Sequence, residues 1–284
     1  MRRYSPGSRQ KNESIFILCI FIVLILFAIW GYLGETYDIV DAIDPNVEKY
    51  NKLIDEWNTL RFSSLWPVQN LPPGDALKGM QDRQARRMLK QMDEIEQSGR
   101  TIRTICETGF FRGGSSLFWL MRFPYAQVHT FDKEAHPEAI RWFKDNFGFQ
   151  WTIYLGPSQE TLRDAAHAKP KLSCDLVFVD GSHEGLDPYH DIRAFRALSH
   201  ARTIVIADDT FDMTRPQITS PSKDFLKDHG CSNSWKRALD ENVIRRSHVF
   251  KNMCYLFGRT PDDMWPLGQC SGEFIPQQDL SILF

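Results

Sequence analysis

The chain has 284 residues, a formal net charge of -2 and 25% charged residues. These values are ordinary for a globular protein of one or two domains, and the lack of a basic surplus argues against a nucleic-acid-binding protein. The sequence shows no low-complexity tract and no internal repeat.

The N-terminal segment contains an uncharged apolar run from Ile15 to Leu33. About 19 residues in a helix, at 1.5 Å each, cross a hydrocarbon core of roughly 30 Å. Basic residues precede the run and acidic residues follow it, so the positive-inside rule keeps residues 1–14 in the cytoplasm. We therefore predict a single-pass type II membrane protein whose remaining residues lie in a lumen, with the Golgi as the expected compartment. A cleaved signal peptide is the alternative, although the run exceeds the usual ~7–15 apolar residues and no A-x-A-like site follows it.

An acidic and then proline-containing segment, residues 34–74, is interpreted as a stem. A helical pattern begins at Asp75 and ends at Ser98, and Gly99 follows it as a C-cap. We expect this helix to pack on the domain that follows. A coiled coil that dimerises the stem is the alternative.

Strand-like runs alternate with helical stretches between residues 101 and 208. The predicted strands are 102–107, 127–132, 151–155, 175–180 and 203–208. The predicted helices between them are 114–121, 137–147, 159–167 and 188–198. This alternation predicts an α/β fold with a parallel sheet covered by helices on both faces.

Two further strand-like runs, 243–250 and 253–257, follow a last predicted helix at 234–240. Only two residues separate the runs, so we expect them to pair as a hairpin. The domain is therefore predicted to cover residues 75–260, and residues 261–284 are interpreted as a C-terminal tail.

The cysteines fall into two groups. Cys106 and Cys174 lie in apolar strand-like segments and are expected to be buried thiols. Cys231, Cys254 and Cys270 lie in the C-terminal region, where one disulfide is plausible in an oxidising compartment. The sequence does not indicate which pair forms.

The run ICETGFFRGGSS, residues 105–116, reads as a strand, a tight glycine turn and the start of a helix. Such a turn brings backbone N–H groups and a helix N-terminus against a ligand. Its glycines do not match the G-x-G-x-x-G dinucleotide fingerprint, and it has no Gly-Lys-Ser/Thr of a P-loop. Glu107 stands two residues before the first turn glycine, where a phosphate would be repelled. The loop therefore predicts a ligand that is not a phosphate.

Acidic residues stand at the carboxyl ends of four predicted strands, the edge at which open α/β sheets bind ligands. They are Glu107, Asp132, Asp180 and the pair Asp208-Asp209. Any one of them can be a helix cap or turn former, but four on one edge favour a binding site. Asp132 follows the loop by about 20 residues, the distance expected for a carboxylate that binds ribose hydroxyls. S-adenosylmethionine, a nucleoside with a positively charged appendage, fits these features.

Five motifs carry a resemblance to a known family: ETGFFRGGSS, VHTFD, GPSQETL, LVFVDGSH and IVIADD. In order and spacing they resemble class I S-adenosylmethionine-dependent methyltransferases over residues 100–259. The resemblance is greatest to the metal-dependent, macrocin-type sugar O-methyltransferases. It implies a doubly wound, seven-stranded, mostly parallel Rossmann-like sheet of order 3-2-1-4-5-7-6, with strand seven antiparallel.

The resemblance also implies site residues. Glu107, Gly109 and Gly113 would border the methionine part of the cofactor. Asp132 would hold the ribose, and Ser158 would lie near the adenine. Ser115 and Asp180 complete the implied cofactor contacts.

A divalent cation, Mg²⁺ or Mn²⁺, is implied on Asp180, Asp208 and Asp209, and His183 would be the general base. Catechol-type relatives have an Asp-Asn pair in place of Asp208-Asp209 and a lysine in place of His183, so the chain follows the sugar branch. These roles for the carboxylates and the histidine are also chemically reasonable when the resemblance is set aside. Three carboxylates suit a hard cation, which acidifies a bound hydroxyl, and a histidine can accept the proton.

The prediction is thus a luminal O-methyltransferase that acts on a hydroxyl of a sugar or glycan. A metal-dependent luminal glycosyltransferase and a non-catalytic, membrane-anchored module with this fold are the alternatives. The expected partners are a glycan or another hydroxyl-bearing substrate and a lipid bilayer through residues 15–33. No nucleic acid is expected, and an oligomer is possible.

Overall fold

The computed structural model describes residues 46–61, 82–210, 230–250, 254–259 and 266–275. The chain divides into two compact units, Met1–Asn51 and Lys52–Phe284, and the sheet and its helices lie in the second. The predicted cytoplasmic tail and membrane run lie outside the described residues. Among the helices within the described ranges, none is long and apolar enough to cross a membrane.

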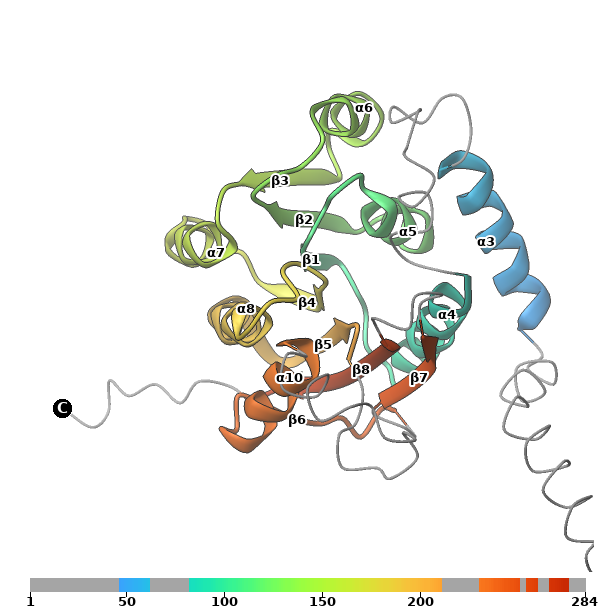
Figure 1. The fold of residues 1–284 in the computed structure, drawn as a ribbon. Helices are drawn as coiled ribbons and strands as arrows, with labels where there is room; N and C mark the ends of the chain where they lie inside the picture. Colours follow the sequence, from blue (N-terminus) through green and yellow to red (C-terminus); the bar gives the residue numbers. More distant parts are fainter. Residues whose placement is uncertain (1–45, 62–81, 211–229, 251–253, 260–265, 276–284) are drawn as a thin grey trace, which may run out of the picture. The chain divides into compact units, whose positions relative to one another are not determined.

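One twisted sheet forms the centre of the second unit (Figure 1). Its strands follow the order β3-β2-β1-β4-β5-β8-β6, and β7 also pairs with β8. Strands β1 to β5 are parallel, whereas β8 runs antiparallel to β5, β6 and β7. The strands are β1 (Thr104–Thr108), β2 (Gln127–Asp132), β3 (Trp151–Leu155), β4 (Cys174–Val179), β5 (Ser199–Asp208), β6 (Ile244–Arg246), β7 (Cys254–Arg259) and β8 (Pro266–Phe274).

Helices cover both faces of the sheet, with α4, α5 and α6 on one side and α7, α8 and α10 on the other (Figure 1). They are α4 (Asp82–Gln97), α5 (Gly114–Arg122), α6 (Pro137–Phe147), α7 (Ser158–His167), α8 (Asp187–Phe195) and α10 (Gly230–Asp240). A further helix, α3 (Val47–Arg61), precedes them, and a short 3₁₀ turn, Arg196–Leu198, leads into β5. The predicted α/β alternation is confirmed, and most element ends fall within a few residues of their predicted positions.

The central strands are apolar because both of their faces are buried. On one face, Phe131, Phe195 and Trp235 belong to a continuous core beneath α7, α8 and α10. On the other face, Trp119 packs edge-on against Phe178, with ring centroids 5.5 Å apart. Each such side chain contributes roughly 1.5–3 kcal/mol through burial, so the core rigidly sets the strand ends that carry the polar residues.

The predicted hairpin between residues 243–250 and 253–257 is wrong. Strands β6 and β7 do not pair with each other in the described structure; both pair with β8. Strand β8 comes from the segment interpreted as a tail, and it lies inside the sheet between β5 and β6. Its buried residues include Gln269, Ser271 and Glu273, so it lacks the apolar alternation that would have predicted a strand.

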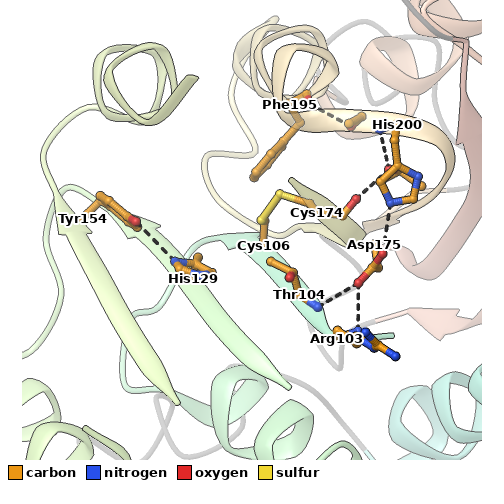
Figure 2. Close-up of a disulfide and its surroundings, with 11 residues drawn as sticks. Arg103, Thr104, Cys106, His129, Tyr154, Cys174, Asp175, Phe195 and His200 are labelled. Atoms are coloured by element: carbon orange, nitrogen blue, oxygen red, sulfur yellow. Dashed lines mark hydrogen bonds and ion pairs between the residues drawn. A yellow bond between two sulfur atoms is a disulfide. The ribbon is translucent and has the colours of Figure 1, made fainter. Parts of the chain in front are cut away.

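The expectation of free thiols at Cys106 and Cys174 is also wrong, because these residues form a disulfide between β1 and β4 (Figure 2). The two strands are neighbours in the sheet, and their Cα atoms lie 5.9 Å apart. Cys254 and Cys270 form a second disulfide between β7 and β8, which confirms that one pair of the C-terminal cysteines is bonded. Cys231 is a buried free thiol.

Candidate active site

The loop between β1 and α5 needs glycine at two positions. Gly109 has φ +88°, and a Cβ there would lie 1.9 Å from the carbonyl oxygen of Asp180. Gly113 has φ +86°, and its Cβ would lie 2.4 Å from the ring of Phe143. Because a side chain is excluded at both positions, the loop backbone lies directly against the end of β4 and against α6.

Glu107 is a fully buried carboxylate beneath this loop. Its Oε1 accepts hydrogen bonds from the hydroxyls of Ser116 and Thr130. Burial raises its pKa to about 7, against the opposing effect of those hydrogen bonds, with Asp180 adding a small repulsion. Its Oε2 is buried and accepts no hydrogen bond of good geometry from the described residues. Glu107, the acid predicted to border the cofactor, therefore has one carboxylate oxygen that can accept a hydrogen bond from a ligand.

Asp132 at the end of β2 fixes the loop from the other side. Its Oδ2 accepts from the backbone N–H groups of Phe110 and Phe111 at 2.6 and 2.8 Å. Its Oδ1 accepts from the backbone N–H of Glu134 at 2.7 Å. Three donors thus hold the carboxylate at the mouth of the loop, and Phe111 beside it is held at φ +49°. The ribose contact of Asp132 stays a prediction.

His183 lies between two carboxylates at the same edge of the sheet. Its Nε2 is 3.5 Å from Asp180 Oδ1, and its Nδ1 is 3.3 Å from Asp209 Oδ2. Burial alone would lower the histidine pKa, but the hydrogen bond to Asp180 and the charges of both carboxylates raise it to about 9. The structure therefore brings together three residues that the sequence placed on one rim, and the two carboxylates favour the protonated form of the imidazole.

Asp208, at the end of β5, is also buried. Gln84, from α4, donates a hydrogen bond to Asp208 Oδ1 at 2.9 Å. Burial raises the pKa of Asp208 well above its usual value, and repulsion from Asp180 and Asp209 adds to the effect. The pKa of Asp209 rises to about 6, mainly through burial, although His183 opposes the shift.

The carboxylates of the predicted metal ligands Asp180, Asp208 and Asp209 therefore repel one another. Their oxygen atoms are suitable ligands for a hard divalent cation, and their combined negative charge favours the binding of such a cation. Within the described ranges, however, no group of three or more His, Cys, Asp or Glu side chains is already spaced as a metal site. His183 lies between Asp180 and Asp209 instead.

Ser158 and Ser115 occupy helix N-terminal turns at this edge. Ser158 begins α7, and its hydroxyl donates to Asp191 Oδ1 at 2.6 Å. Asp191, on α8, is 2% exposed, and burial raises its pKa to about 6. Sequence reasoning missed Asp191 and Gln84. The sequence carries a signal that could have found Asp191, because it is an acidic residue on the same helix face as the buried Ile192 and Phe195.

Comparisons with known proteins identify a methyltransferase domain in this part of the chain. A family model described as a methyltransferase domain matches residues 106–210. O-methyltransferase ankF of Aspergillus thermomutatus is 31% identical over 128 residues, which cover 43% of this chain and 52% of that protein. The chain thus spans about half the length of the curated relative that it matches.

Two solved methyltransferase structures show similarity to this chain. The methyltransferase PaMTH1 of Podospora anserina, solved with SAH bound, has 17% identity and a TM-score of 0.51, with 97% of this chain and 100% of that chain covered. The O-methyltransferase TomG of Streptomyces achromogenes, solved with SAM, has 15% identity and a TM-score of 0.49, with 78% and 97% covered. The strand order and the family match define the class: residues 106–210 lie in a Rossmann-like fold of the methyltransferase type.

Proposed function

We propose that this protein is an S-adenosylmethionine-dependent O-methyltransferase. The observation that carries the proposal is the buried Glu107 beneath the Gly109–Gly113 loop, with Oε2 left as an acceptor. A carboxylate there repels phosphate but attracts an ammonium group. The name of the Aspergillus relative and the SAH in the Podospora structure are consistent with this ligand.

The chain's own residues would prepare the acceptor hydroxyl. S-adenosylmethionine, when bound, supplies an electrophilic methyl group. The remaining requirement is to position the hydroxyl and remove its proton. His183 is the base in this proposal, and Asp180 and Asp209, 3.5 and 3.3 Å from its ring nitrogens, orient the ring.

The raised pKa of His183 limits when it can act. At a pKa of about 9 the imidazole is protonated at neutral pH, so it accepts a proton only once the charge of Asp180 and Asp209 is neutralised. A divalent cation held by Asp180, Asp208 and Asp209 would supply that neutralisation and would acidify the acceptor hydroxyl. We therefore include a cation, Mg²⁺ or Mn²⁺, in the proposal.

We further propose a sugar or glycan acceptor, as the resemblance to the macrocin-type branch implies, and a luminal location in the secretory pathway, with the Golgi as the expected compartment. Two disulfides support the location, because disulfides persist in oxidising compartments. Protease protection of a C-terminal tag in sealed microsomes tests the topology. Digestion of the tag without detergent would contradict a luminal domain.

Calorimetry of the full chain with S-adenosylmethionine, SAH and a nucleotide sugar tests the cofactor. We expect the first two ligands to bind and the third not to bind. Transfer of labelled methyl groups to a panel of glycans, with and without a chelator, then tests the reaction. Tight binding of the nucleotide sugar alone would replace the methyltransferase proposal with the glycosyltransferase alternative. If labelled methyl groups are transferred equally well with and without the chelator, the reaction does not need the proposed cation.

A further inference from the structure

Strand β8 carries three buried polar side chains on the sheet face that α4 covers. Gln269, Ser271 and Glu273 alternate along the strand, and residues two apart in a strand point to the same face. Gln91 of α4 donates a hydrogen bond to Ser271 Oγ at 2.7 Å, and Arg100, just after α4, forms an ion pair with Glu273. Two of the three polar side chains therefore have partners from the segment that covers this face.

Gln269 differs from the other two because its amide is buried without a partner. The residue is fully buried, and within the described part of the chain neither Nε2 nor Oε1 of the amide makes a hydrogen bond. A buried polar group without a partner destabilises the fold, because it has given up its hydrogen bonds to water. A ligand that binds the amide would offset this loss, and the position of Gln269 indicates which ligand it is.

Gln269 lies beside Asp208 at the carboxyl end of β5. The two residues are opposite each other in the antiparallel pair of β5 and β8, and opposite residues point to the same face with Cβ atoms about 4.5–5.5 Å apart. Gln84 of α4 donates to Asp208 Oδ1 at 2.9 Å, which places Asp208 on the α4 face as well. The amide of Gln269 is therefore aimed toward a carboxylate that is proposed to bind the cation.

Burial and charge at this position favour a small cation as the ligand. Asp208 and Gln269 are 6% and 0% exposed, which suits an ion enclosed by its ligands better than a large acceptor molecule. Hard divalent cations take about six oxygen ligands, which include amide carbonyls as well as carboxylates. Within the described ranges the acids alone are not spaced as a metal site. A neutral amide oxygen adds a ligand without adding to the repulsion among the carboxylates.

We propose that Gln269 is a further ligand of the cation, and that its Oε1 binds the ion together with the carboxylates of Asp180, Asp208 and Asp209. This inference rests on the cation of the proposed function. The amide N–H₂ group lies on the same side of the sheet as the Asp208 carboxylate, to which it can donate. Gln269 lies outside residues 106–210, which match the methyltransferase family model, so the C-terminal strand β8 would complete a site that the βα units begin.

Titration of the full chain with Mn²⁺, followed by the EPR signal of the free ion, tests this proposal. Gln269→Met removes the amide but keeps the length of the side chain. We expect it to weaken Mn²⁺ binding by about tenfold or more, which is the loss that follows removal of even a partner of a metal ligand. Gln91→Met makes the same change at a buried position of α4 and should leave the Mn²⁺ affinity unchanged, because Gln91 bonds to Ser271.

Thermal unfolding separates a ligand from a purely structural residue. Gln269→Met replaces an unpartnered amide, so its Tm without metal should be no lower than that of the wild type, whereas loss of a structural group would lower it. Gln269→Glu keeps an oxygen ligand and adds a buried negative charge. Its Tm should therefore fall without metal, and added Mn²⁺ should raise it by more than it raises the Tm of the wild type.

The outcomes distinguish this inference from the proposed function. If the wild type binds Mn²⁺ and both Gln269 variants bind it with the same affinity, Gln269 is not a ligand, and a cation held by the three aspartates remains. If the wild type binds no Mn²⁺, the cation of the proposed function is wrong and this inference is wrong with it. Calorimetry with SAH in the presence of a chelator measures the cofactor separately in either case.

Discussion

The substitution Glu107→Gln should make the ligand-free protein more stable at alkaline pH while weakening its affinity for the cofactor. The carboxyl pKa rises from 4.5 to about 7 in the fold, which at 1.36 kcal/mol per pKa unit corresponds to about 3 kcal/mol. Because the pKa of this acid is raised in the folded state, the protonated carboxyl group makes its full contribution to the stability of the fold below pH 4.5. That stability is lost as the pH rises through about 7. Glutamine cannot ionise, so the variant avoids the loss.

Urea unfolding of the ligand-free full chain at pH 5 and pH 8 measures the difference. We expect Glu107→Gln to exceed the wild type by about 3 kcal/mol at pH 8 and by less than about 1 kcal/mol at pH 5. Glu56→Gln makes the same chemical change at an exposed position and should have little effect. Equal stabilities of wild type and Glu107→Gln at pH 8 would refute the assigned burial cost.

The same variant tests the ligand. An ammonium group against Oε2 would favour the ionised carboxylate, so binding of SAH should release up to one proton per site near pH 6.5. Calorimetry in two buffers of different ionisation enthalpy measures that release. Loss of a charged hydrogen bond should weaken binding by about tenfold or more, and Glu107→Gln should release no proton. If Glu107→Gln binds SAH with unchanged affinity, Glu107 does not contact the cofactor.

Three further changes probe other parts of the domain. His183→Asn should lower the methyl-transfer rate by about a hundredfold or more while SAH affinity is retained; an unchanged rate would exclude His183 as the base. Replacing Cys106 and Cys174 together by alanine should cost about 4 kcal/mol in urea unfolding, because their bond closes a 68-residue separation; no measurable loss would mean that the bond does not form. Burial lowers the pKa of His129 to about 4, so the wild type should lose up to about 3 kcal/mol as the pH falls from 6.5 to 4. His129→Gln should flatten that slope, and an unaltered slope would assign it to another group.

The βα units could be predicted from the sequence because each strand is a short apolar run with a clear helix after it. Strand β8 could not, because Gln269, Ser271 and Glu273 are buried polar residues, and the partners of Ser271 and Glu273 come from distant segments. Gln91 donates to Ser271, and Arg100 pairs with Glu273. A polar strand of this kind is recognisable only after its neighbours are known.

In the candidate site, too, some features could be predicted from the sequence and others could not. The strand-end rule placed Glu107, Asp132, Asp180 and Asp208 at one edge, because that rule depends only on the direction of the strands. The contact of His183 with both Asp180 and Asp209 depends on the path of two loops, which residue spacing does not determine. The Cys106–Cys174 bond likewise requires the order of β1 and β4 in the sheet.

The place of β8 affects how the protein can be made. During synthesis β5 emerges well before β8, so the edge of β5 that will accept β8 first exists as an unpaired, apolar strand that includes Ile204 and Ile206. Unpaired apolar edges recruit other chains. A chain interrupted before Pro266 would therefore be expected to aggregate rather than fold, and a nascent chain would depend on chaperones until its last inner strand is inserted.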